Sequence, residues 1–202
     1  MKIRFVFHKP QGERGVGKAI VVWTWVLGLF YNWKVLKYNY SHEELWLPDD
    51  DGSFITGHRD NYVRFRATKT YVHPMKYSYC GKCFSSTTRG TAEGVRFAPA
   101  SEVLGKHPER WDYIEVEVDE ARLEIAVEQA RQLVGAKYDF AGIFGFLLPL
   151  PVQDGQRWYC SEICDWFKVL AGVYPKRYKR ISPRRAACVL AKRWGEPKQL
   201  KK

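Results

Sequence analysis

The sequence predicts an α+β fold, with strands dominating the middle of the chain and helices flanking them. Two patterns carry this prediction. Trp111–Val118 (WDYIEVEV) alternates apolar and polar residues, which is the period of a strand with one buried face. After Asp119, apolar residues recur every three or four positions, which is the period of an amphipathic helix. The chain has 202 residues, 46% of them hydrophobic, and is long enough for one sizeable core.

The first part of the chain is expected to supply two strands separated by a helix. Lys2–Phe7 alternates as a strand, and a Gly-rich loop, 10–17, follows it. The segment 18–37 is expected to be a helix. Its most apolar run, 19–31, is shorter than the roughly 18–20 residues that span a bilayer, so we expect a buried helix, with a helix on a membrane surface as the alternative. Ser41–Leu47 is expected to be the second strand.

The remaining elements are read from periodicity and from residues that cap helices. Short strands are expected within 53–75 and 76–97. Asp119 suits the N-cap of the helix that follows it, and Gly135 suits its end. Two further helices are expected, one over Cys160–Leu170 with one apolar face and one that begins at Ser182 and ends near Trp194.

The positive charge is concentrated at the end of the chain. The segment from Pro175 to Lys202 contains eleven of the 33 Lys and Arg residues and one of the 22 acidic residues. We therefore expect a single domain over residues 1–195 and a basic tail over 196–202. Such an end is suited to an anionic polymer, to nucleic acid or to a membrane surface, or it simply keeps the chain soluble.

The cysteine count favours reduced thiols. An odd number, five, is not typical of a disulfide framework in a chain of this length. The first ten residues read as a strand and not as a signal peptide. We therefore expect a cytoplasmic protein, with peripheral membrane association as an option.

Two familiar site patterns are incomplete. The segment Gly12–Lys18 has the spacing of a phosphate-binding loop, but Ala19 stands where a Mg²⁺-binding hydroxyl belongs, so a flexible turn is the better interpretation. Four thiols, on Cys80, Cys83, Cys160 and Cys164, would be enough for structural zinc. The second pair falls on a predicted helix, where Cys164 suits a buried apolar face. We expect neither a metal nor a cofactor.

A thiol nucleophile with a histidine base is the third candidate site. Cys160 follows a loop and begins a predicted helix, where unpaired N–H groups stabilise a thiolate and an oxyanion. His42 lies on a predicted strand, and Glu44, two residues later, shares its face. An inert cysteine and a structural histidine are the alternative interpretation.

Several short motifs occur in an order that resembles one enzyme family. They are Tyr40–Leu45 (YSHEEL), Lys137–Asp139 (KYD) and Trp158–Glu162 (WYCSE), with Ile181–Pro183 (ISP) after them. The chain over 38–190 resembles the permuted NlpC-type papain-like cysteine hydrolases, the YiiX-like proteins, which include members carried by bacteriophages. The resemblance implies a circularly permuted papain-like fold, in which a small antiparallel sheet or half-barrel packs against helices.

By this resemblance Cys160 is the nucleophile and His42 is its base. A third, polar residue orients the imidazole in this family. Residues 49–78 read as an insertion, which leaves several candidates for that role. Glu44 is preferred because a carboxylate fixes the tautomer and stabilises an imidazolium. The alternatives are Ser85, Ser86, Thr56 and His58.

The expected function is that of a thiol hydrolase acting through an acyl-enzyme. Its substrate would be a peptide or other amide, or an acyl lipid, in a bacterial or phage-infected cell. The alternative is a non-catalytic binding or host-interaction module that uses the basic C-terminus.

Overall fold

The centre of the molecule is a six-stranded antiparallel sheet in the order β10-β7-β1-β2-β5-β6. The computed structural model describes residues 1–10, 38–56, 78–88, 93–144, 156–175 and 181–200. The strands are β1 (Lys2–His8), β2 (His42–Leu47), β5 (Lys82–Thr87), β6 (Gly94–Pro99), β7 (Trp111–Glu117) and β10 (Lys198–Gln199). β1 and β2 are therefore central strands, each flanked on both sides.

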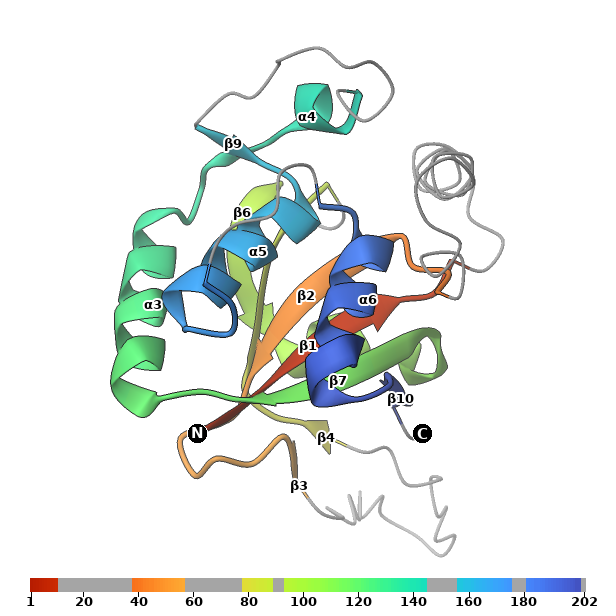
Figure 1. Ribbon diagram of the computed structural model, residues 1–202, viewed down its shortest axis with the longest axis vertical. Helices are drawn as coiled ribbons and strands as arrows, with labels where there is room; N and C mark the ends of the chain where they lie inside the picture. The colour runs from red at the N-terminus through yellow and green to blue at the C-terminus, as the bar shows by residue number, and fades with distance from the viewer. Residues whose placement is uncertain (11–37, 57–77, 89–92, 145–155, 176–180, 201–202) are drawn as a thin grey trace, which may run out of the picture.

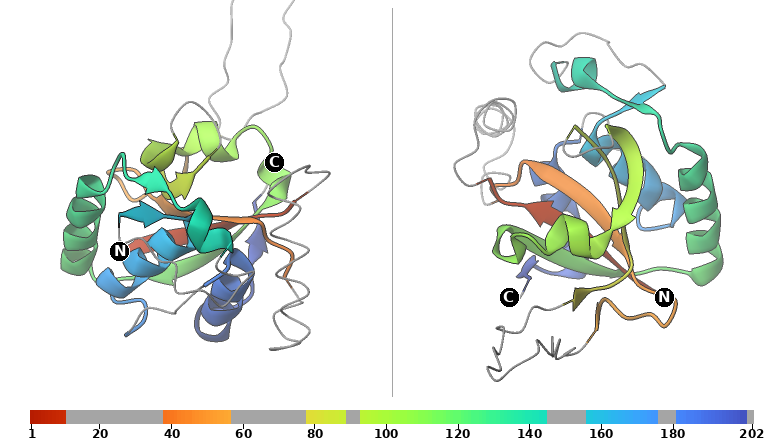
Figure 2. Two further views of the ribbon diagram at one scale, coloured as in Figure 1. Left: turned by 90° about the horizontal axis from the view of Figure 1, so that it is seen from above. Right: turned by 180° about the vertical axis from the view of Figure 1, so that it is seen from behind.

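Helices cover the two faces of the sheet unequally (Figure 1). On one face lie α5 (Cys160–Leu170) and α6 (Pro183–Trp194), and α3 (Glu120–Gln132) packs beside α5. The opposite face carries the short α2 (Ala100–Leu104), as the view from behind shows (Figure 2). The α+β class predicted from the sequence is confirmed.

Two small ladders complete the described secondary structure. β3 (Ile55–Thr56) pairs with β4 (Ser78–Tyr79) and closes the base of the segment 49–78. β8 (Lys137–Tyr138) pairs in parallel with β9 (Arg157–Trp158), which leads directly into α5. The short helix α4 (Phe140–Phe144) follows β8, and a 3₁₀ turn (Pro108–Arg110) precedes β7.

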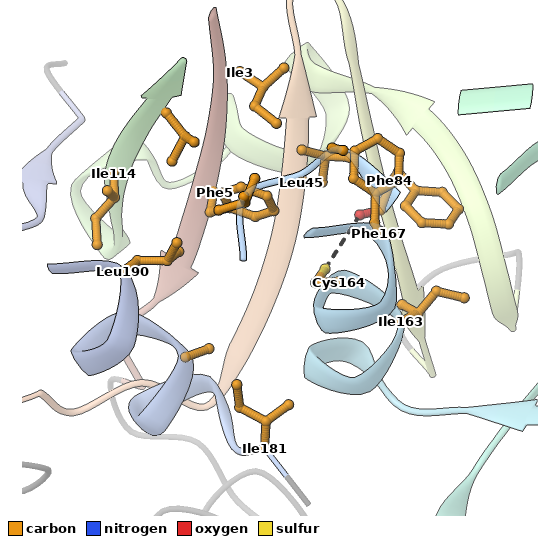
Figure 3. Packing of buried hydrophobic residues seen from close by; sticks show 14 of the residues in the cluster. Ile3, Phe5, Leu45, Phe84, Ile114, Ile163, Cys164, Phe167, Ile181 and Leu190 are labelled. Atoms are coloured by element: carbon orange, nitrogen blue, oxygen red, sulfur yellow. Dashed lines mark hydrogen bonds between the residues drawn. The ribbon is translucent and has the colours of Figure 1, made fainter. Parts of the chain in front are cut away.

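The main core lies between the sheet and α5 and α6. Alternate residues of β1, Ile3, Phe5 and Phe7, are buried in it, as the strand period requires. Figure 3 shows Ile3 and Phe5 on the side of the sheet that carries Phe167 of α5 and Leu190 of α6. This packing fixes α5 against β2 and β5, the strands that it contacts.

The helix ends predicted from the sequence are confirmed. The Asp119 carboxylate accepts a hydrogen bond from the Arg122 N–H at 3.0 Å, which caps α3. Gly135, with φ of 90°, follows the last turn of that helix. The Ser182 hydroxyl accepts from the Arg185 N–H at 3.3 Å, and Pro183 takes the first position of α6.

The prediction of a tail over 196–202 is wrong for its described part. Lys198 and Gln199 form β10, which pairs with Tyr113 and Asp112 of β7. Leu200 is only 3% exposed and belongs to the core cluster on the α2 face of the sheet. The sheet provides hydrogen-bond partners for the backbone here, and the core buries the Leu200 side chain. The segment is therefore part of the fold despite its positive charge.

Several expectations lie outside the described residues. They are the Gly-rich loop from residue 11 on, the helix over 18–37 and the part of the predicted strand region 53–75 that follows residue 56. Within the described ranges, none of the helices combines the length and the apolar character needed to cross a membrane.

Candidate active site

Cys160 is the first residue of α5. Its side chain is 4% exposed, and it stands where the two-residue strand β9 turns into the helix (Figure 1). Tyr159 is the N-cap and makes no side-chain capping bond, and the first intrahelical bond runs from the Ile163 N–H to the Tyr159 carbonyl at 3.1 Å. The N–H groups of Cys160 and Ser161 precede this first intrahelical bond, as at every helix N-terminus. They are suited to hold a negatively charged oxygen beside the sulfur.

His42 is the first residue of β2, and its imidazole lies close enough to the Cys160 thiol for that group to raise the pKa of the ring. The ring is 7% exposed. Burial by itself lowers the pKa of His42, but the sulfur of Cys160 and the carboxylate of Glu44 together raise this pKa to about 9. A protonated imidazole beside the sulfur at neutral pH is therefore the favoured state of the ring.

Glu44 holds the other side of the same ring. The Nε2–H of His42 donates to Oε1 of Glu44 at 2.9 Å, which leaves Nδ1 as the ring nitrogen for Cys160. Burial favours the neutral carboxyl, but the hydrogen bond from His42 and the charge of Arg96 outweigh it, so the pKa of Glu44 is lowered. An ionised Glu44 accepts from the ring and fixes its tautomer.

Arg96 holds the carboxylate of Glu44 from β6. Its Nη2 lies 2.9 Å from Oε1 and its Nη1 lies 3.3 Å from Oε2. The strand β5 separates β6 from β2, and the β5 residue paired with Arg96 is Ser85. Paired residues of an antiparallel ladder share a face. A serine at this position leaves room for the long arginine to reach across β5.

A buried ion pair on the other face of β2 joins this strand to α5. Lys168 of α5 donates to Oε1 of Glu43, and both side chains are fully buried. Burial raises the pKa of Glu43 to about 7, while the Lys168 ammonium acts in the opposite direction. The pair joins the residue next to His42 to the helix that begins at Cys160, so it fixes the helix relative to the strand.

The walls around His42 are aromatic and polar. The ring of Trp111 lies edge-on to His42, with ring centroids 6.4 Å apart, and contacts His8 at 5.0 Å. Nδ1 of His8 lies 3.3 Å from the Ser41 hydroxyl. These groups shield the histidine and account for its burial.

Neither Ser85 nor Ser86 is hydrogen-bonded to His42 in the described structure. The Ser85 hydroxyl donates to the Glu43 carbonyl at 2.7 Å, and that of Ser86 is buried with no hydrogen-bond partner among the described residues. Thr56 lies on β3, in a separate small sheet. His58 lies outside the described residues. Glu44 is the candidate that the structure places on the ring.

The metal alternative finds no support within the described ranges. There, no group of three or more histidine, cysteine or acidic side chains is arranged to hold an ion. The cysteine pairs are separated: Cys83 lies in the cluster of Trp46, and Cys164 lies in the main core, where its thiol is 3.9 Å from the Phe84 carbonyl (Figure 3). The phosphate-loop pattern, Gly12–Lys18, lies outside the described residues.

Two residues of this arrangement were not predicted from the sequence. Arg96 lies in an ordinary strand pattern, and Lys168 occupies a position on α5 where a charge is expected to be exposed. The sequence around Lys168 does not indicate its ion-pair partner, because Glu43 is 125 positions away in the chain.

Comparison with protein-family models, with curated proteins and with solved structures found no match. The site is therefore interpreted from its own geometry.

Proposed function

We propose that this protein is a thiol hydrolase that cleaves an acyl compound through a Cys160 acyl-enzyme. The observation that carries the proposal is the chain of contacts from Cys160 to His42 to Glu44 at the start of a helix. A nucleophile, a base bonded to it and a carboxylate that orients the base are the parts that acyl transfer requires. The order of the histidine strand before the cysteine helix supports the permuted NlpC-type papain-like resemblance.

In the first half of the reaction the Cys160 sulfur attacks the carbonyl carbon of an amide, ester or thioester. A carbon–sulfur bond forms, and the carbonyl electron pair moves to oxygen, where N–H groups at the start of α5 stabilise it. The pair then returns, the bond to the leaving group breaks, and Nδ1–H of His42 donates its proton to that group.

In the second half water replaces the leaving group. Neutral His42 accepts a proton from water as the oxygen attacks the thioester carbon, and the sulfur departs as thiolate. The product is a carboxylic acid, and the imidazolium beside the thiolate is restored. Glu44 stabilises each imidazolium state by accepting from Nε2–H.

The test is an acyl-enzyme trapped on a defined residue. The protein is mixed with p-nitrophenyl acetate, quenched in acid and analysed by intact mass and by peptide mapping. We expect one acetyl group on Cys160 in the wild type and none on that peptide in Cys160→Ser or Cys160→Ala. Cys80→Ser is the matched control and should acylate as the wild type does. Cys80 is partly exposed, and its carbonyl accepts from Trp46, near the opposite end of β2 from His42.

Equal acetylation of the wild type and of Cys160→Ala would overturn the proposal. So would wild-type protein that releases p-nitrophenol no faster than denatured protein. The latter result would favour the binding-module alternative, in which the same shell holds a ligand without turnover.

A further inference from the structure

A pocket of about 410 Å³ lies beside α6. It is formed by the chain that follows α5 and by one side of α6. Its lining residues are Val173, Tyr174, Pro175, Arg185, Cys188, Val189, Leu190, Lys192, Arg193 and Trp194. Cys160, His42 and Glu44 are not among the described residues that line it, so the pocket is a site of its own.

The helix α6 presents a mixed stripe to this pocket. Cys188 and Val189 lie three and four positions after Arg185, and Lys192 lies four and three positions after them. The four residues therefore share one face of the helix. The opposite side of α6 is buried against the sheet and is not available to a ligand. The pocket thus has a floor of cations and short apolar side chains.

The charge of the lining has one sign. Arg185, Lys192 and Arg193 are all exposed, and none of the described residues of the lining is acidic. Arg193 is held in place, because Nη1 donates to the Val173 carbonyl at 3.1 Å and its guanidinium lies over the Trp194 ring at 5.2 Å. Fixed guanidinium groups bind phosphate more strongly than mobile ones do, since less side-chain entropy is lost.

Trp194 adds a hydrogen-bond donor and a flat aromatic ring to the lining. The indole N–H of Trp194 is buried and has no hydrogen-bond acceptor among the described residues. Val173, Pro175 and Val189 supply apolar walls. A ligand that satisfies this lining has anionic acceptor oxygens at one end and an apolar or aromatic group at the other.

We infer that this pocket binds an organic phosphate, with the phosphate held by Arg185, Lys192 and Arg193 and the organic group packed on the apolar wall. A phosphate monoester carries nearly two negative charges at neutral pH, which matches three cations better than a single carboxylate does. The volume is within the range of small-molecule sites. The inference does not depend on the hydrolase proposal, since the two sites share no residue.

Cys188 provides a direct readout because its thiol lines the pocket and is partly exposed. Wild-type protein is treated with iodoacetamide with and without phenyl phosphate, and alkylation of Cys188, Cys80 and Cys160 is followed by peptide mapping. We expect phenyl phosphate to slow the alkylation of Cys188 and to leave Cys80 unchanged. Slowing at Cys160 alone would instead indicate binding at the candidate active site and would overturn the inference.

Binding is measured in parallel by calorimetry at fixed ionic strength. The double variant Arg185→Gln/Lys192→Gln should raise the dissociation constant of phenyl phosphate by about tenfold or more. The control, Arg131→Gln/Lys106→Gln, removes the same charge from exposed positions outside the pocket and should bind as the wild type does. Equal weakening in both variants would show non-specific attraction to a basic surface and would overturn the inference.

The chemical class is tested with two partial ligands. Phenol tests the organic group alone and inorganic phosphate tests the anion alone, and both should bind more weakly than phenyl phosphate. If inorganic phosphate binds as tightly as phenyl phosphate, the pocket holds an adventitious ion only, and the inference is overturned.

To separate soluble from lipid sources, vesicles of phosphatidylcholine with and without phosphatidic acid are compared. Protection of Cys188 by either phosphate source supports the inference, and protection by neither overturns it.

Discussion

Arg96 holds both carboxylate oxygens of Glu44, with Nη2 2.9 Å from Oε1 and Nη1 3.3 Å from Oε2. The same Oε1 accepts from Nε2–H of His42 at 2.9 Å. Arg96 therefore acts on the histidine through the carboxylate, and the three side chains form a single line from β6 to β2. We regard Arg96 as a positioning residue of the proposed hydrolase.

Arg96→Gln should lower the rate of Cys160 acylation by about 10- to 100-fold, because a misoriented base costs rate even when it is present. The apparent KM for p-nitrophenyl acetate should change little, since Arg96 is not placed to touch the substrate. Arg96→Lys should restore the charge but only part of the rate, because lysine cannot make the paired contact. Full activity in Arg96→Gln would contradict this role.

The lowered pKa of Glu44 also predicts a dependence of stability on pH. A carboxyl whose pKa is lower in the folded state stabilises the fold above its unfolded pKa of about 4.5, and this contribution is lost as the pH falls through the folded value. The stability advantage of wild type over Glu44→Gln should therefore be largest near neutral pH and shrink below about pH 4.5. Urea unfolding at several pH values measures this difference. An advantage that grows on acidification would refute the assignment.

The raised pKa of His42 predicts different pH dependences for the acylation and the alkylation of Cys160. Acylation by an amide needs a proton from His42, so its rate should fall as the pH rises through about 9, where the imidazolium is lost. Alkylation by iodoacetamide needs the thiolate but no proton, so its rate should not fall there. In His42→Gln, alkylation at pH 7 should be slower by about tenfold. If both wild-type reactions lose rate near pH 9, His42 is not the proton donor.

The buried Lys168–Glu43 pair predicts a large and unequal effect of mutation. Lys168→Met leaves Glu43 buried without its cation and should lower the free energy of unfolding by about 3–5 kcal/mol. The double variant Lys168→Met/Glu43→Leu removes both charges and should be more stable than the single variant. Urea unfolding followed by tryptophan fluorescence provides the measurement. A cost below about 1 kcal/mol for Lys168→Met would show that the pair does not brace α5 against β2.

Leu200 tests whether the end of the chain belongs to the fold. Its side chain is buried in the cluster of Val6 and Trp111, and its N–H donates to the Trp111 carbonyl at 3.0 Å. Leu200→Ala should therefore cost about 2–3 kcal/mol of stability. Lys198→Ala, at an exposed position of β10, should change stability by less than about 0.5 kcal/mol. If both substitutions change the free energy of unfolding by equally small amounts, the end of the chain is a tail and not part of the fold.

The sequence by itself determined the local elements and three residues of the candidate site, Cys160, His42 and Glu44. Strand alternation identified β7, helical spacing and Asp119 identified α3, and Ser182 marked the start of α6. These features depend on neighbours within a few positions, so they can be read from a short segment. The placement of His42 and Glu44 on one strand face follows from the same short-range geometry.

The tertiary structure alone decided which distant residues meet. The sequence left five candidates for the third role, and the fold placed Glu44 on His42, brought Arg96 across β5 to Glu44, and turned the expected tail into an edge strand. The order of strands in a sheet is set by long-range pairing and by burial of the whole core. The alternating pattern of a strand is compatible with pairing to many other strands. The residues of that strand do not by themselves indicate which strand will lie next to it in the sheet.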